Sequence, residues 1–204
     1  MNEAGLGFRV KSGWAMVVLV SASSPPVVID RRRIDLSDPA VPASAQPFHA
    51  GLDLPRAAAA KAVARLVKCV ERSSNLTIAE LIERYRAKGS RIVGAGIVVG
   101  STVDPQTIGN DHIRAHAEEG QLFRVVIEDA LKLSRLKSSV IREQDLIDEG
   151  RKMLGIPGPR LRTELAKMGK AVAGSWRAEE RAATLAALMA LARWSRSRIR
   201  TGKS

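Results

Sequence analysis

Residues 104–119 form the part of this sequence that is richest in side chains able to do chemistry. They include His112 and His116, which would share one face of a helix beginning just before His112. Two imidazoles at this spacing can bind one metal ion. A third ligand would come from Asp104, or from His49 in a distant proline-rich segment.

Three interpretations of this stretch stay open. Asp104, His112 and His116 could be the catalytic residues of a metal-dependent hydrolase, with a divalent metal ion as its cofactor. The same residues with Arg114 could form a polar site of another kind. The histidines could also form only ordinary contacts at the start of a helix.

Cations in several places predict binding to anions. Lys11 and Ser12 follow a predicted strand and could hold a phosphate oxygen, as could Arg114. The net charge is +12, and residues 151–204 hold 13 Lys and Arg against 3 Asp and Glu, a net charge of +10. Such a segment is attracted to polyanions, of which nucleic acid is the commonest inside cells. The candidate nucleic-acid-binding residues are Arg31, Arg32, Arg33, Arg193, Arg196, Arg198, Arg200 and Lys203.

Composition excludes several classes of protein. Apolar residues make up 45% of the 204 residues, enough to build a core and too many for a disordered chain. No run of about 18 uncharged apolar residues exists, so we expect no membrane span and a cytoplasmic location. A single cysteine cannot form an internal disulfide bond.

The order of predicted elements begins with strands and continues with alternating helices and strands. Alternating apolar and charged residues, or β-branched runs, predict the first three strands, which short links would join as an antiparallel meander. We expect residues 1–7 to be loose. The predicted strands are 8–11, 14–20, 27–36, 91–100 and 138–141.

Helices are predicted where apolar residues recur at helical spacing. One should begin near Pro55 and end at Ser73-Ser74-Asn75, and a second should begin at Thr77. Others should follow residue 110 and the break at 155–159, and we expect the final residues, SRSRIRTGKS, to be frayed. The glycines of residues 94–100 should permit close packing of a central strand.

This order of elements, over about residues 8–155, resembles the ribonuclease H-like superfamily of nucleases, junction resolvases and ATPases. The resemblance implies an α/β fold, with a mixed sheet, an N-terminal antiparallel meander and helices on its faces. With the break at 155–159 and the basic C-terminal quarter, we expect two parts: a ribonuclease H-like domain at 1–155, and a basic helical extension with a frayed tail at 156–204.

Nucleases of this superfamily place carboxylates on the first strand, the first helix, the end of the fourth strand and the last helix, where they hold two divalent cations. Here the first strand offers Arg9 and Lys11. Asp104 matches the fourth-strand position, and Asp145 or Asp148 could match that of the last helix.

We therefore expect a nucleic-acid-binding domain that is non-catalytic or catalytically degenerate and needs no cofactor. The alternatives are the hydrolase described above and a protein interaction module. In the module, an apolar stripe would dock a partner helix, and the sequence does not predict the oligomeric state. That stripe consists of Leu185, Leu188, Met189 and Ala192.

Overall fold

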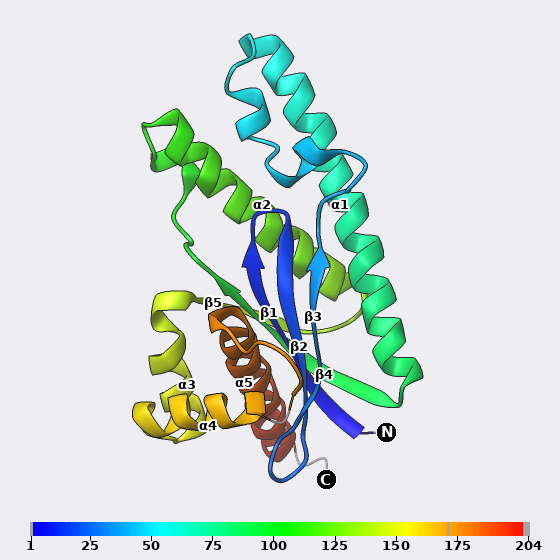
Figure 1. The fold of residues 1–204 in the computed structure, drawn as a ribbon, viewed down its shortest axis with the longest axis vertical. Coiled ribbons are helices and arrows are strands. Elements are labelled where there is room, and N and C mark those ends of the chain that lie inside the picture. Colours follow the sequence, from blue (N-terminus) through cyan, green and yellow to red (C-terminus); the bar gives the residue numbers. More distant parts are fainter. Residues whose placement is uncertain (1, 171, 202–204) are drawn as a thin grey trace.

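A computed structural model describes residues 2–170 and 172–201 of the chain, and its centre is a five-stranded mixed sheet (Figure 1). The strand order is β3-β2-β1-β4-β5. β1 is antiparallel to β2, and β2 is antiparallel to β3, while β4 is parallel to both β1 and β5. The predicted mixed sheet with an N-terminal meander is therefore confirmed. The strands are β1 Asn2–Lys11, β2 Trp14–Ser21, β3 Val28–Asp35, β4 Ser90–Val99 and β5 Ser138–Arg142.

Helices cover both faces of the sheet (Figure 1). α1 and α2 pack on one face, where Phe8 of β1 and Phe123 of α2 are fully buried in one core. α5 packs on the other face, with α3 and α4 beside it. The helices are α1 Arg56–Ala87, α2 Asp111–Leu133, α3 Leu146–Leu154, α4 Gly158–Lys170 and α5 Ala178–Thr201. Short 3-10 helices are η1 Pro42–Ala45, η2 His49–Gly51, η3 Pro105–Thr107 and η4 Glu143–Asp145.

Glycines in β1 and β4 let the backbone of α5 approach the backbone of these two strands closely. A Cβ atom added to Gly96 of β4 would lie 2.5 Å from the carbonyl oxygen of Ala186. Added Cβ atoms at Gly5 and Gly7 of β1 would likewise collide with backbone atoms of α5. The predicted role of the β4 glycines in close packing is therefore confirmed at Gly96, and two glycines of β1 share it.

The first strand begins earlier than the sequence predicted. β1 starts at Asn2, and Ala4 and Leu6 are fully buried, so residues 2–7 are not loose. β1 is the middle strand of the sheet and is paired on both sides, which holds its first residues in place.

The predicted break at residues 73–75 is also wrong, because α1 runs unbroken for 32 residues. Ser74 is fully buried, and its hydroxyl donates a hydrogen bond of 2.9 Å to the carbonyl oxygen of Leu36. This tertiary contact outweighs the modest helix propensity of serine and asparagine.

The C-terminal helix is part of the core. Leu185 and Met189 are fully buried in one apolar cluster with Val98 of β4. These residues of the stripe that was predicted to dock a partner therefore pack within this chain. Helix α5 continues to Thr201, so residues 195–201 are helical and not frayed; residues 202–204 lie outside the described residues. The domain boundary at residue 155 stays a prediction.

Of the helices in the described ranges, none has the length and apolar character needed to cross a bilayer.

Candidate functional site

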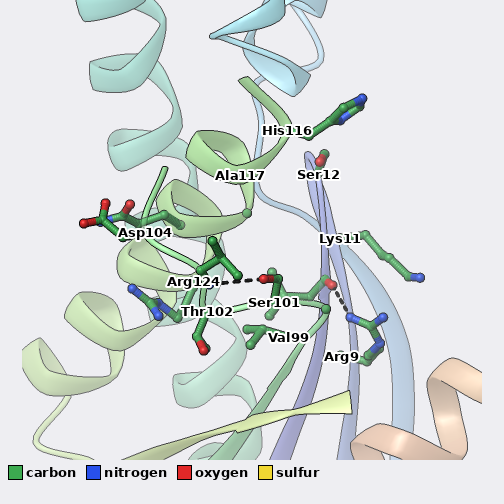
Figure 2. Close-up of a pocket in the computed structure, with 15 residues that line it drawn as sticks. Arg9, Lys11, Ser12, Val99, Ser101, Thr102, Asp104, His116, Ala117 and Arg124 are labelled. Carbon is green, nitrogen blue, oxygen red and sulfur yellow. Dashed lines mark hydrogen bonds between the residues drawn. The ribbon is translucent and has the colours of Figure 1, made fainter. Parts of the chain in front are cut away.

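A pocket of about 610 Å³ opens beyond the carboxyl ends of β1 and β4, with α2 as one wall (Figure 2). In sheets with helices on their faces, ligands commonly sit at this end of parallel strands. The pocket is lined by Arg9, Val10, Lys11, Ser12, Val99, Gly100, Ser101, Thr102, Val103, Asp104, His116, Ala117, Gly120, Gln121 and Arg124.

Arg9 lies at the inner side of the pocket, and its side chain is only 4% exposed. It donates a hydrogen bond of 2.7 Å to the carbonyl oxygen of Val10 and forms an ion pair with Glu143 of η4. Its Nε atom is buried and has no hydrogen-bond partner among the described residues. A buried guanidinium therefore keeps one donor unused beside the pocket.

Two more cations line the same pocket, and within the described part of the chain each forms only a long ion pair. Lys11 Nζ lies 3.9 Å from Glu179, at the start of α5. Arg124 Nε lies 3.6 Å from Glu128, one turn later in α2. Neither distance is a hydrogen bond, so both groups can still bind an anion.

Asp104 is the one acid among the residues that line the pocket. Its carboxylate caps η3 by accepting a hydrogen bond of 3.0 Å from the backbone N–H of Gln106. A pair of divalent cations needs several carboxylate oxygens, whereas this pocket offers one carboxylate against three cationic side chains. The residues present do not fit a two-metal centre.

Comparison with solved structures identifies the fold. A Thermus thermophilus RuvC structure matches 100% of this chain and 98% of its own, with a TM-score of 0.50 and 10% sequence identity. The chain has the fold of RuvC. The ribonuclease H-like architecture predicted from the order of elements is therefore confirmed.

A second similar structure is T. thermophilus RuvC in complex with a Holliday junction substrate. It covers 100% of this chain and 97% of its own, at 12% identity and a TM-score of 0.49. No family model matches the sequence, and no curated protein matches it.

The RuvC-like fold does not bring the other predicted acids into the pocket. Asp145 lies in η4 and accepts a hydrogen bond of 2.5 Å from Arg142. Asp148 is exposed on α3, 3.9 Å from Arg151. Neither lines the pocket that holds Asp104.

The predicted anion-binding residues divide between two places. Lys11 and Ser12 both line the pocket. Arg114 does not line it: it donates a hydrogen bond of 3.1 Å to the carbonyl oxygen of Ile108 and pairs with Asp111. Arg114 thereby fixes the loop that enters α2.

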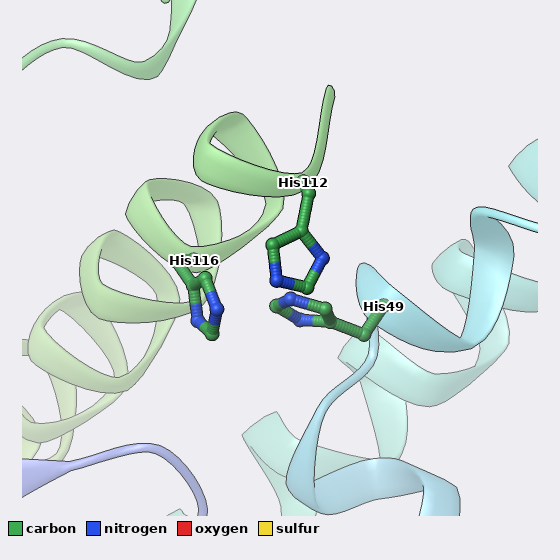
Figure 3. Close-up of side chains that lie close together, drawn as sticks. All are labelled: His49, His112 and His116. Atoms are coloured by element: carbon green, nitrogen blue, oxygen red, sulfur yellow. The ribbon is translucent and has the colours of Figure 1, made fainter. Parts of the chain in front are cut away.

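The three histidines converge beside the pocket (Figure 3). His112 and His116 lie on the first turns of α2, whose N-cap is Asn110, as the sequence allowed. His49 comes from η2, and one ring nitrogen from each histidine lies within 4.8 Å of the others. Asp104 does not join this group; Figure 2 shows it across the pocket from His116. Asp104 and His116 therefore line one pocket, whereas His112 does not line it, and the catalytic role predicted for the three residues stays a prediction.

A buried acid that the sequence did not single out holds one of these histidines. Glu119 of α2 has no exposed side-chain surface, and its Oε1 lies 2.8 Å from Nδ1 of His49. The backbone N–H of His49 donates to the same oxygen at 3.3 Å. Glu119 lies seven residues after His112, two helical turns along the same face, and this spacing was the available signal.

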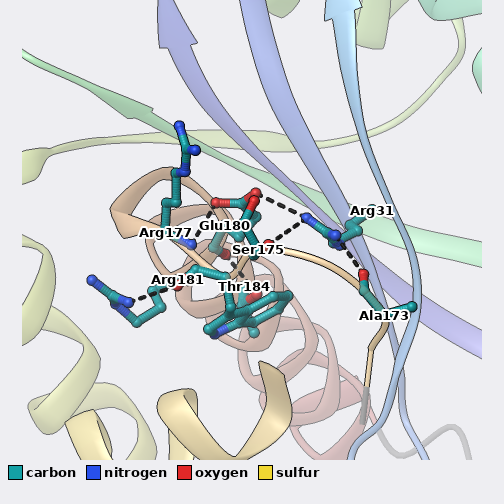
Figure 4. A network of polar contacts seen from close by, with 8 residues as sticks. Arg31, Ala173, Ser175, Arg177, Glu180, Arg181 and Thr184 are labelled. Atoms are coloured by element: carbon teal, nitrogen blue, oxygen red, sulfur yellow. Dashed lines mark hydrogen bonds and ion pairs between the residues drawn. The ribbon is translucent and has the colours of Figure 1, made fainter. Parts of the chain in front are cut away.

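The arginine run on β3 serves mainly to fix the edge of the sheet. Arg31 donates hydrogen bonds of 2.5 Å to the carbonyl oxygen of Ala173 and 2.6 Å to that of Ser175 (Figure 4). It also lies 3.0 Å from Glu180 Oε1. Arg31 thus ties β3 to the segment before α5.

The next two arginines have local partners. Arg32 lies 2.7 Å from Asp30, which also accepts a hydrogen bond of 2.8 Å from Tyr85 of α1. Burial raises the pKa of Asp30, but the hydrogen bonds from Arg32 and Tyr85 outweigh this effect, and its pKa is lowered overall. Burial, with the neighbouring Asp30 carboxylate, raises the pKa of Tyr85.

Arg33 lies over the Trp14 ring, 4.6 Å from its centroid, and is 60% exposed. Of the three arginines, it is therefore the one with most of its side chain open to solvent.

Because α5 runs opposite to β1, Arg196 and Arg198 lie at the other end of the sheet from the pocket. Arg193 instead lines a neighbouring groove together with Thr102 and Arg124, which also line the pocket. Arg198 lies 3.3 Å from Glu3 at the start of β1. Arg196 donates a hydrogen bond of 2.8 Å to the carbonyl oxygen of Met153. Arg193 lines a second pocket of about 500 Å³, together with Trp194. Arg200 belongs to α5, and Lys203 lies outside the described residues.

Proposed function

We propose that this chain is a non-catalytic nucleic-acid-binding domain, and that the pocket at the ends of β1 and β4 holds a backbone phosphate. The observation that carries the proposal is the replacement of acids by cations at this position in a ribonuclease H-like fold. Arg9, Lys11 and Arg124 line the pocket, with Asp104 as its single acid. A phosphate would gain there the charge-assisted hydrogen bonds that guanidinium and ammonium groups provide.

The donors available to such a phosphate differ in kind. The buried Arg9 side chain is positioned by its ion pair with Glu143, so its guanidinium charge would be held in place before the ligand arrives. Lys11 and Arg124 would add charge from side chains that are more exposed than that of Arg9. Hydroxyl groups of Ser12, Ser101 and Thr102 also line the pocket and could donate to phosphate oxygens.

Cations outside the pocket would extend the contact along the phosphate chain. Residues 151–204 carry a net charge of +10. Exposed cations of α3 and α4 give this part of the surface a positive field, which would raise both affinity and association rate. They are Arg151, Lys152, Arg160, Arg162, Lys167 and Lys170.

The cationic side chains of the pocket are also the reason why the proposed domain does not catalyse hydrolysis. Divalent cations in nucleases are held by carboxylates, and three cationic side chains around one carboxylate would repel Mg²⁺. Binding would then depend on phosphate contacts and not on hydrolysis. Contacts of this kind carry no sequence information, so little discrimination between sequences is expected.

Binding and cleavage should be measured together on the full chain. Fluorescence anisotropy with labelled single-stranded DNA, duplex DNA, a four-way DNA junction and RNA should show binding at low salt. Incubation of the same probes with Mg²⁺ or Mn²⁺ should leave them intact. Absence of binding to every probe at low salt would contradict the proposal.

Metal-dependent cleavage would contradict the non-catalytic part of the proposal. If that cleavage is lost in Asp104→Ala, the hydrolase interpretation takes its place. If cleavage persists in that variant, the reacting residues lie outside this pocket.

A further inference from the structure

We propose that His49, His112 and His116 together bind one Zn²⁺ ion, which joins the proline-rich segment before α1 to the start of α2. The chain contains 3 histidines in all, and the fold brings every one of them to this place. His49 is separated from the other two by the whole of α1 and β4. Their convergence therefore depends on tertiary structure and not on proximity along the chain.

The three rings lie close together and at steep angles to one another (Figure 3). Ring centroids are 4.2 Å apart for His49 and His116, and 4.8 Å apart for each of the other two pairs. Zinc binds imidazole nitrogen at about 2.1 Å, which places the ligand nitrogens of a tetrahedral site about 3.3 Å apart. The nitrogens here lie within 4.8 Å of one another, so the His112 and His116 side chains would have to rotate to bring them to that spacing. His112 and His116 are exposed and have room to rotate.

His49 is already oriented as a ligand. The contact of 2.8 Å between its Nδ1 and Oε1 of Glu119 makes Nδ1 the donor to the carboxylate and leaves Nε2 as the atom with the free lone pair. Nε2 is buried and has no hydrogen-bond partner among the described residues. A carboxylate that holds one nitrogen of an imidazole while the other nitrogen binds metal is a common arrangement at zinc sites.

Glu119 also makes the site electrically favourable. Its carboxylate is fully buried, and Oε2 lacks a hydrogen-bond partner in the described part of the chain. A buried carboxylate oxygen without a hydrogen-bond donor is poorly stabilised, whereas a dication behind His49 would provide opposite charge. The structure therefore contains both a free ligand atom and an acid in need of a nearby cation.

The ligand set selects the class of metal. Imidazole nitrogen suits Zn²⁺ and neighbouring transition metals, while Mg²⁺ and Ca²⁺ require oxygen ligands. Three protein ligands leave a fourth tetrahedral position for water. Because His116 also lines the pocket described above, the ion would lie next to that pocket.

The site is tested by titrating the full chain, freed of metal by a chelator, with ZnCl₂ in a calorimeter. The protein must carry no polyhistidine tag. We expect one Zn²⁺ per chain, and a rise in Tm when the ion is present, because the ion binds only the folded state. Replacement by Co²⁺ should give the visible absorption of a tetrahedral centre.

Two variants test the named residues. His112→Ala removes an exposed ligand without disturbing the core and should weaken Zn²⁺ binding by at least about 10-fold. Glu119→Gln leaves all three ligands in place but removes the carboxylate that orients His49, and should weaken binding by about 10- to 100-fold. Asp111→Asn, next to His112 but outside the cluster, is the matched control and should bind as the wild type does.

Failure of the wild-type chain to bind Zn²⁺ would overturn the inference. So would binding that is unchanged in both His112→Ala and Glu119→Gln, or binding of Mg²⁺ with equal affinity. The titration contains no nucleic acid, so its result does not depend on the function proposed above.

Discussion

Arg31 Nη1 on β3 lies 3.0 Å from Oε1 of Glu180 at the start of α5, and this ion pair joins the edge of the sheet to the helix that covers it (Figure 4). The Glu180 side chain is 4% exposed and that of Arg31 is 20% exposed. Glu180 also accepts a hydrogen bond of 2.9 Å from the backbone N–H of Arg177, which satisfies its second oxygen. An arginine predicted to contact nucleic acid is thus a structural link.

Loss of this link should destabilise the fold. Arg31→Ala leaves the buried Glu180 carboxylate without its cation and is expected to lower the free energy of unfolding by about 3 kcal/mol, measured by urea denaturation. Arg33→Ala on the same strand is the control. Because Arg33 is 60% exposed and 3.5 Å from Asp35, its loss should cost at most about 1 kcal/mol. Equal effects of the two substitutions would contradict the assigned role of Arg31.

The close packing of α5 on β4 can be tested with two glycines of the same strand. Gly96→Ala would place Cβ 2.5 Å from the Ala186 carbonyl oxygen, and should lower the free energy of unfolding by about 3 kcal/mol. Gly94→Ala would place Cβ no closer than 3.5 Å to any neighbour and should be nearly neutral. Thermal unfolding of both variants decides this, and a stable Gly96→Ala variant would show that α5 lies further from the sheet.

The Asp30 carboxylate gives stability a defined dependence on pH. Its folded-state pKa is lowered, so the ionised form stabilises the fold above the unfolded-state pKa, about 3.9, and this contribution is lost as pH falls through the folded-state pKa. Asp30→Asn should therefore be less stable than the wild type at neutral pH, with the difference shrinking below about pH 4. Urea denaturation at several pH values measures it, and Asp35→Asn controls for loss of an exposed charge from β3. A difference that grows in acid would contradict this account.

Much of the architecture was predictable because its signals are local. Alternation along β1 and β2, the apolar run of β4 and the periodicity of α2 each predict their element from neighbouring residues. Arg9 and Lys11 on the first strand were visible as cations where nucleases of the ribonuclease H-like superfamily have an acid. His112 and His116 were visible as an i, i+4 pair.

What the sequence did not reveal depends on interactions between distant segments. Nothing near Ser74 in the sequence indicates that its hydroxyl donates a hydrogen bond to a carbonyl oxygen 38 residues away. Residues 73–75, whose helix propensity is low, were therefore predicted to end the helix. The burial of Glu119 becomes apparent only when η2 packs against α2. The basic residues around α5 concealed its role, because high charge normally indicates a solvent-exposed segment.

The central claim is that the pocket at the ends of β1 and β4 binds a phosphate of nucleic acid, and the salt dependence of binding tests it most directly. Anisotropy titrations of labelled DNA between about 50 and 200 mM salt should give a linear fall of log K with log salt. The double variant Lys11→Ala/Arg124→Ala should bind more weakly, with a slope reduced by about 2, because each substitution removes one phosphate-binding cation.

The control for that measurement is Arg84→Gln, an exposed cation near the far end of α1, which should keep the wild-type slope. Slopes that are equal in the wild type and in the double variant would contradict the claim that this pocket holds phosphate. A slope that falls in the double variant alone, with Arg84→Gln unchanged, is the result the account predicts.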